Sequence, residues 1–205
     1  KNMIKNMTEN TQIKLPKTFT CLDETLSLSQ KILSIAVDDT KTLFHTPVVS
    51  SHNGNSISSR VMVLREFDKE NRKMRFHTDY RAQKIQHYKK NPTATVIGYD
   101  PDLKIQIKLQ GNIVAHFNDE ITKAAWDSST TRSKKCYSVK GGSTKIIDDP
   151  SDYDIKEFNV EDGYKNFAVL IFTFKTLEFL FLKSSGHRRA LHKWDTDFQS
   201  SWLVP

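Results

Sequence analysis

The stretch Arg-Val-Met-Val-Leu-Arg, residues 60–65, places an arginine at each end of a short apolar run. Because side chains alternate across a strand, Arg60 is expected to share one face with Met62 and Leu64, while Arg65 lies on the other. A charged group at the end of a buried strand is costly unless it is paired or binds a ligand. The run therefore predicts either salt bridges at a barrel rim or the edge of a binding site.

A second cationic group follows in His-Thr-Asp-Tyr-Arg-Ala-Gln-Lys, residues 77–84. Thr78, Arg81 and Lys84 fall at the end of a predicted strand and in the first turns of a predicted helix, where backbone N–H groups favour an anion. Each charge-assisted hydrogen bond to a phosphate contributes about 1.5–3 kcal/mol. Three such contacts approach the roughly 8 kcal/mol of micromolar binding. The pattern predicts a site for one compact phosphate group rather than a nucleic-acid backbone.

The surrounding sequence predicts short antiparallel strands joined by turns. Asn53-Gly54 is a strong hairpin signal, and it opens a β-meander. Residues 165–183 are predicted to form a pair of apolar strands. The remaining strands are predicted at residues 42–51, 56–68, 74–78, 93–100, 103–117, 187–194 and 198–205, the last two as a terminal hairpin. Helices are predicted at residues 23–39, 79–92 and 118–129.

These elements predict a mainly β fold, an antiparallel β-barrel with a few flanking helices. A chain of 205 residues can bury one large core, so we expect a single domain over residues 21–205. Residues 1–20 are polar and are predicted to form a flexible arm. The polar, acidic stretch 133–163 is predicted to be a long loop, either a lid or a mobile crossover.

Composition narrows the class of protein. The chain has 31 Lys and Arg residues against 24 Asp and Glu residues, a net charge of +7, which favours an anionic partner. Cys21 and Cys136 are far apart and form no Cys-x-x-Cys motif, which argues against a zinc site or a disulfide framework and favours the cytoplasm. No apolar run approaches the roughly 20 residues of a membrane-spanning helix.

The stretch from Arg60 to Pro92 resembles the FMN-binding signature of the pyridoxamine 5′-phosphate oxidase family. That signature has an Arg…Leu-x-Lys/Arg strand, an aromatic residue or His before Thr, then Arg-Ser-x-Lys and Asn-Pro. The similarity continues through Ile-Gln-Ile-Lys-Leu-Gln-Gly (105–111) and returns in residues 187–194 and the final Trp-Leu-Val-Pro. It covers about residues 40–130 and 165–205. It implies a split β-barrel that forms a homodimer with FMN at the subunit interface.

The same resemblance implies the roles of individual residues. Arg60, Arg81 and Lys84 would bind the FMN phosphate, and Arg65 would lie near the flavin edge or the substrate. Gln106 would reach a flavin held by the partner subunit. The implied cofactor-binding set is Arg60, Val61, Met62, Val63, Leu64, Arg65, His77, Thr78, Arg81, Ala82, Gln83, Lys84, Gln106 and His192. The implied substrate residues are Arg132 and Arg188.

Departures from the family pattern shape the functional hypothesis. The family's serine is replaced by Ala82, its substrate-binding histidine by Ala190, and a flavin-side arginine by His192. We therefore expect an FMN-dependent oxidoreductase with an unknown small substrate, and pyridoxamine phosphate oxidation becomes doubtful. The alternative is a non-catalytic barrel that binds flavin or haem, the latter through His187 and His192. A nucleic-acid-binding barrel is disfavoured because the phenylalanines of the C-terminal strands are expected in the core.

Overall fold

An antiparallel sheet makes up most of the fold in the computed structural model, which describes residues 13–155 and 159–205. In chain order the described strands are β1 (Val48–His52), β2 (Ile57–Val61), β3 (Leu64–Asp68), β4 (Lys73–Asp79), β5 (Thr93–Asp100), β6 (Ile105–His116), β7 (Phe167–Phe181), β8 (Arg188–Trp194) and β9 (Phe198–Leu203). The described helices are α1 (Leu22–Ala36), α2 (Lys84–Lys90), α3 (Glu120–Asp127), α4 (Thr131–Lys135) and α5 (Val160–Tyr164), with short 3-10 turns η1 (Leu43–His45) and η2 (Pro150–Tyr153). The predicted fold class is confirmed.

Neighbouring strands follow the order β2-β1-β5-β6-β7-β4-β3, with β8 beside β7 and β9 beside β8. The edge strands of that order, β2 and β3, are consecutive in the chain, so the backbone through Met62 and Val63 closes the barrel. The sequence predicted one strand over residues 56–68, and this prediction is wrong. The segment pairs first with β1 and then with β4, so the expected meander is two separate hairpins. We call residues 60–65 the seam.

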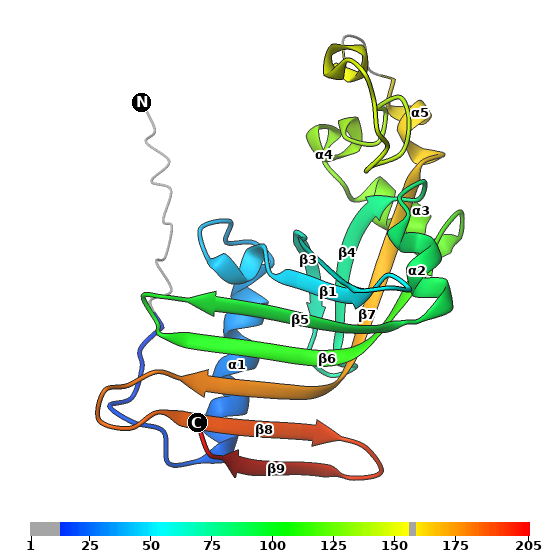
Figure 1. The fold of residues 1–205 in the computed structure, drawn as a ribbon. Helices are drawn as coiled ribbons and strands as arrows, with labels where there is room; N and C mark the ends of the chain where they lie inside the picture. The colour runs from blue at the N-terminus through cyan, green and yellow to red at the C-terminus, as the bar shows by residue number, and fades with distance from the viewer. Residues whose placement is uncertain (1–12, 156–158) are drawn as a thin grey trace, which may run out of the picture.

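The long strand β7 joins the two halves of the barrel. Its first half pairs with β4 and its second half with β8, while β6 runs along its other side. Figure 1 shows β7 turning from an upright course beside β4 into the flat part of the sheet. The sequence predicted two strands over residues 165–183, and this prediction is wrong because β7 is one continuous strand. The run has no Gly or Pro that would form a turn between two strands.

The bend is accommodated by a register shift between Gln110 and Gly111 of β6. A Cβ atom built on Gly111 would lie 2.0 Å from the carbonyl oxygen of Thr173 on β7. Only glycine therefore permits the two backbones to approach so closely where the sheet turns.

Helix α1 covers the inner face of the sheet and lies behind it in Figure 1. It buries Ile32, Leu33 and Ala36, and the residues before it are anchored as well. Phe19 is 1% exposed, and its ring lies 5.0 Å from Phe179. The end of the predicted N-terminal arm is thus packed on the core, while its residues 1–12 lie outside the described residues. None of the described helices has the length and apolar character to cross a membrane.

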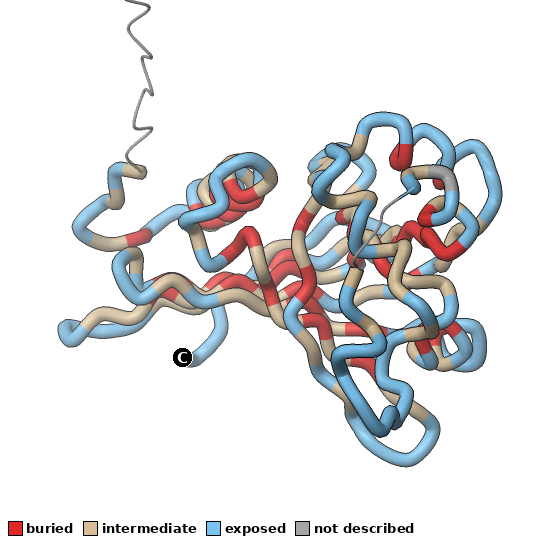
Figure 2. Tube along the Cα trace, turned by 90° about the horizontal axis from the view of Figure 1, so that it is seen from above, coloured by how far each residue is buried: buried red, intermediate tan, exposed pale blue. Residues whose placement is uncertain are grey.

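Between β6 and β7, the described residues 117–155 and 159–166 form a lobe that we call the excursion. It carries α3, α4 and α5, so the predicted loop over residues 133–163 includes short helices. The excursion packs Ala125 and Trp126 on Phe167 and Val169 of β7, which forms a small second core. Figure 2 shows buried segments running through the middle of the molecule, with the exposed loops at its periphery.

Candidate functional site

Arg60 lies at the seam on β2, and its guanidinium group is surrounded by neutral oxygens. Its Nη1 donates to Ser51 Oγ at 2.9 Å, to the Val49 carbonyl at 3.3 Å and to the Tyr88 hydroxyl at 3.4 Å. Its Nη2 donates to Ser58 Oγ at 2.8 Å. Strands β1 and β2 and helix α2 thus fix the position of this charge without neutralising it.

Lys84 is the first residue of α2, and its half-buried ammonium group lies in the electrostatic field of Arg60. Burial lowers the pKa of Lys84, the positive charge of Arg60 lowers it further, and Asp79 opposes both effects. Within the described part of the chain, neither Arg60 nor Lys84 forms an ion pair with a carboxylate. We call these two residues the seam pair. Two cations whose charges interact in this way, and which have no carboxylate partner, favour the binding of an anion.

Arg81 has a different environment from the one that the resemblance implied. Its Nη2 lies 2.6 Å from Asp79 Oδ2, and the same nitrogen donates to the Val139 carbonyl of the excursion at 2.9 Å. A Cβ atom on Gly142 would lie 2.8 Å from the Arg81 carbonyl oxygen, so the excursion also contacts the backbone here. We call these contacts of Arg81 with Asp79, Val139 and Gly142 the clasp. The charge of Arg81 is compensated, and its side chain holds the excursion.

The turn between β4 and α2 places the other predicted phosphate residues. Thr78 and Ala82 are buried, and Gln83 is exposed just before the helix. The sequence predicts a helix that begins at residue 79. Instead α2 begins at Lys84, and the Asp79 carboxylate accepts from the backbone N–H of Arg81.

The ring of His77 packs edge-on against Phe167 with centroids 4.9 Å apart, and the charge of Arg65 acts on both His77 and Tyr137 of the excursion. The Nε of Arg65 and the Nε2 of His77 are buried and have no hydrogen-bond partner among the described residues. Burial, followed by the charges of Arg75 and Arg65, lowers the pKa of His77 to about 3, so its ring is neutral. Burial also raises the pKa of Tyr137, an effect that the charge of Arg65 opposes. Sequence reasoning did not find Tyr137, because it comes from the predicted loop.

The seam backbone presents alternate side chains to solvent. Val61 is 62% exposed and Val63 is half-buried, whereas Met62 and Leu64 point into the core. Gln106 on β6 lies on the same outer face as Val61. Together they line an apolar groove of about 410 Å³, whose other residues are Leu43, Thr46, Pro47, Val48, Ile97, Gly98 and Tyr99.

The remaining predicted site residues lie elsewhere. His192 is 0% exposed, and its two ring nitrogens are hydrogen-bonded to Thr25 Oγ1 and Ser200 Oγ. Arg188 donates to the carbonyl oxygens of Phe19, Gly186 and His187. Arg132 is exposed on α4. The structure therefore does not bring Arg132, Arg188 or His192 to the seam pair.

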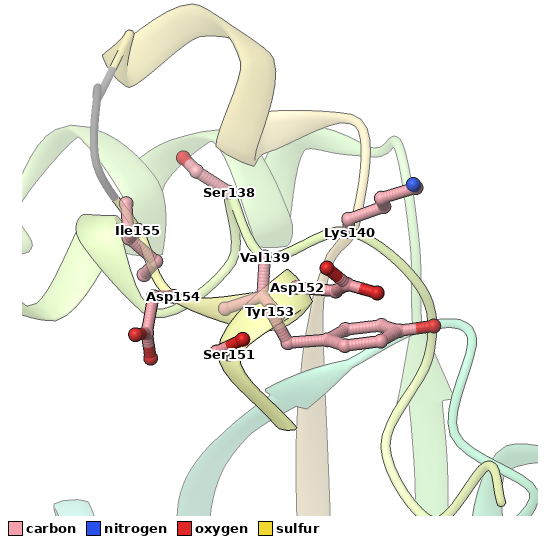
Figure 3. A pocket seen from close by; sticks show the side chains of 8 residues that line it. All are labelled: Ser138, Val139, Lys140, Ser151, Asp152, Tyr153, Asp154 and Ile155. Carbon is pink, nitrogen blue, oxygen red and sulfur yellow. The ribbon is translucent and has the colours of Figure 1, made fainter. Parts of the chain in front are cut away.

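A cavity of about 490 Å³ opens within the excursion (Figure 3), and its lining comes from two stretches of that segment, residues 138–140 and 151–155. None of the predicted cofactor residues lines it. One of its lining residues, Val139, accepts a hydrogen bond from Arg81 through its carbonyl oxygen. No cluster of His, Cys, Asp or Glu in the described residues is suited to hold a metal ion.

Comparison with known proteins places this geometry in context. Residues 27–116 match a family model described as pyridoxamine 5′-phosphate oxidase, FMN-binding domain. A search of curated protein sequences found no match. The matched range contains the seam, the clasp residues Asp79 and Arg81, and Gln106.

Solved structures resemble the whole barrel. A pyridoxamine 5′-phosphate oxidase-related, FMN-binding protein from Nostoc punctiforme PCC 73102 superposes with a TM-score of 0.71 at 15% identity, over 92% of this chain and 100% of that chain. PhzG from Burkholderia lata 383, solved with tetrahydrophenazine-1-carboxylic acid, gives a TM-score of 0.69 at 18% identity, over 88% and 92% of the two chains. At these identities the likeness concerns the fold, and it confirms the antiparallel split barrel.

Proposed function

We propose that this chain, whose residues 27–116 match a family model described as pyridoxamine 5′-phosphate oxidase, FMN-binding domain, binds FMN and uses it to oxidise or reduce a small organic molecule. The observation that supports this most strongly is the seam pair. The positive charge of Arg60 lowers the pKa of Lys84, and neither side chain forms an ion pair with a carboxylate among the described residues. A phosphate would neutralise both side chains, and each contact would contribute about 1.5–3 kcal/mol.

The residues along the seam fit the rest of the cofactor. Val61 and Val63 present small apolar side chains outward, so a flat ring system can lie against the backbone there. The unpartnered Nε of Arg65 provides a hydrogen-bond donor and a positive charge at the far end of the seam. A bound flavin supplies the hydride or electron transfer, and the protein supplies orientation, charge and control of solvent access.

We propose that the functional unit is a homodimer that packs through the uncovered face of the sheet. In Figure 1 no helix lies in front of β5, β6 and β8, whereas α1 lies behind them. Large apolar side chains are exposed on this face, with Val61 at 62% and Tyr99 at 41%. A second copy placed here would cover them and bring its Gln106 towards the flavin of the first.

The structure leads us to omit a haem site from this proposal. Both ring nitrogens of His192 are engaged inside the core, and His187 Nδ1 accepts from the backbone N–H of Lys183. Neither histidine therefore favours a haem site.

The free, exposed Cys21 and Cys136 fit a reducing compartment such as the cytoplasm, which we include in the proposal.

A titration of the purified protein tests this function. FMN added to the flavin-free protein is expected to bind with a Kd in the micromolar range or below, and riboflavin far more weakly, because riboflavin lacks the phosphate. The bound flavin should then be reduced anaerobically and challenged with candidate substrates, since turnover separates an enzyme from a flavin carrier. Failure to bind FMN, or equal affinity for FMN and riboflavin, would contradict the proposal.

A further inference from the structure

The hydrogen bonds of Arg60 identify side chains that the sequence pattern did not. Three of its four hydrogen-bond acceptors are hydroxyl groups, and they come from β1, β2 and α2: Ser51, Ser58 and Tyr88. A hydroxyl can accept a hydrogen bond from a guanidinium group and still donate its own proton to another group. This matters at the seam because Ala82 stands where the family pattern has a serine.

The three hydroxyls differ in exposure. Ser51 and Tyr88 are each 3% exposed, so a ligand outside the barrel cannot contact them directly. Burial raises the pKa of Tyr88, so its phenol keeps its proton. Ser58 is half-buried, and within the described chain its hydroxyl group contacts Arg60 alone.

We propose that Ser58 donates a hydrogen bond to the flavin phosphate, and that Ser51 and Tyr88 are positioning residues that hold Arg60 against it. This inference rests on the proposed FMN site and adds to it the hydroxyl groups of Ser51, Ser58 and Tyr88, which we call the hydroxyl shell. Ser58 provides the O–H contact that Ala82 cannot make. The buried pair fixes the guanidinium group before the ligand arrives, so less conformational freedom is lost on binding.

The variant Ser58→Ala tests the direct contact. The Kd for FMN should rise about tenfold, because a hydrogen bond to a charged group is lost, while the Kd for riboflavin stays unchanged. Ser59→Ala is the matched control: Ser59 is adjacent, lies on the opposite face of β2, and its hydroxyl is hydrogen-bonded to Ser50. It should leave both affinities unchanged.

The variant Tyr88→Phe tests the positioning role in a double-mutant cycle with Arg60→Gln. Alone it should weaken FMN binding about fivefold without affecting riboflavin. In the Arg60→Gln background it should have no further effect, because Tyr88 acts through Arg60, whereas Ser58→Ala should still weaken binding there. Tyr80→Phe is the control, since the Tyr80 hydroxyl contacts Lys89 rather than Arg60.

The outcomes separate this inference from the proposed function. If the unmodified chain does not prefer FMN to riboflavin, both fail. If it does, but Ser58→Ala binds FMN as tightly as the unmodified chain, the hydroxyl shell is overturned and the FMN site stands. An equal loss of FMN and riboflavin affinity in Ser58→Ala or Tyr88→Phe would also overturn it, since the change would then be structural.

Discussion

The seam pair and Arg81 of the clasp all carry positive charges, but only Arg81 is paired with a carboxylate among the described residues. Arg60 and Lys84 have no carboxylate partner among the described residues, whereas Arg81 lies 2.6 Å from Asp79 and holds the excursion through Val139. All three cations come from one recognisable sequence pattern. The difference is that folding pairs Arg81 with a carboxylate and leaves Arg60 and Lys84 without one among the described residues, so our proposal places the phosphate at the seam pair.

The largest effect is expected from removing the seam pair. Arg60→Gln combined with Lys84→Met should weaken FMN binding by about 100-fold or more, because two charge-assisted contacts of about 1.5–3 kcal/mol each are lost. Isothermal titration with FMN measures the change, and riboflavin serves as the control ligand. If the double variant binds FMN as tightly as the unmodified chain does, the seam pair contributes no more to FMN binding than the clasp does.

A pH dependence is expected from His77, which lies on β4 two residues before the clasp. Its pKa is about 3 in the fold, below the value of 6.5 in the unfolded chain, so the unfolded chain binds the extra proton between these values. The stabilisation is therefore complete above about pH 6.5 and is lost as the pH falls towards 3, by at most about 1.4 kcal/mol per pH unit. Urea unfolding of the flavin-free protein at pH 7.5 and pH 5 measures this loss.

The control for that experiment is His77→Gln, which cannot titrate in this range. Its free energy of unfolding should fall less between pH 7.5 and pH 5 than that of the unmodified chain. If the two proteins lose the same stability over this interval, then His77 is not held neutral by burial and the charges of Arg75 and Arg65.

Asp79→Asn is expected to strengthen FMN binding. The effect is smaller than that of removing the seam pair and opposite in sign. This change removes the negative charge that compensates Arg81, while the amide oxygen can still accept from the backbone N–H of Arg81. The local charge becomes more positive, so FMN should bind up to about fivefold more tightly, as is typical of a partly exposed ion pair worth up to about 1 kcal/mol. The gain should shrink at high salt. Weaker FMN binding would show that the clasp supports the phosphate site instead of competing with it.

The smallest effect on the cofactor is expected from Arg81→Ala. FMN affinity should fall by less than about threefold, because Arg81 does not contact the phosphate in our proposal and its loss only leaves Asp79 without its partner. The excursion should instead become more accessible, and limited proteolysis should cut residues 138–155 faster than in the unmodified chain. Lys140→Ala, an exposed change on the same segment, is the matched control and should leave the cleavage rate unchanged.

Local sequence signals predicted much of the fold. Asn53-Gly54 produced the hairpin between β1 and β2, and the alternation of residues 105–110 produced β6. The helix predicted over residues 118–129 contains α3, whose capping box is formed by Asp119 and Thr122. In each case the deciding interaction lies within a few residues of the chain, where a sequence pattern records it.

The errors come from contacts between distant segments. The split of the 56–68 strand depends on which partner each half finds, β1 or β4. The single course of β7 depends on the close approach at Gly111. The sequence also does not record that the Arg81 side chain bonds to Asp79 and to a carbonyl 58 residues along the chain, while its predicted role at the phosphate stays a prediction. The hydroxyl groups around Arg60 belong to no motif, so only the folded barrel identifies them.

The most direct test of the account is a crystal structure of the chain with FMN bound. We expect the phosphate oxygens to lie within about 3.2 Å of both the Arg60 guanidinium and the Lys84 ammonium group, with Arg81 still paired to Asp79. A phosphate that contacts Arg81 while Arg60 and Lys84 point elsewhere would contradict the central claim.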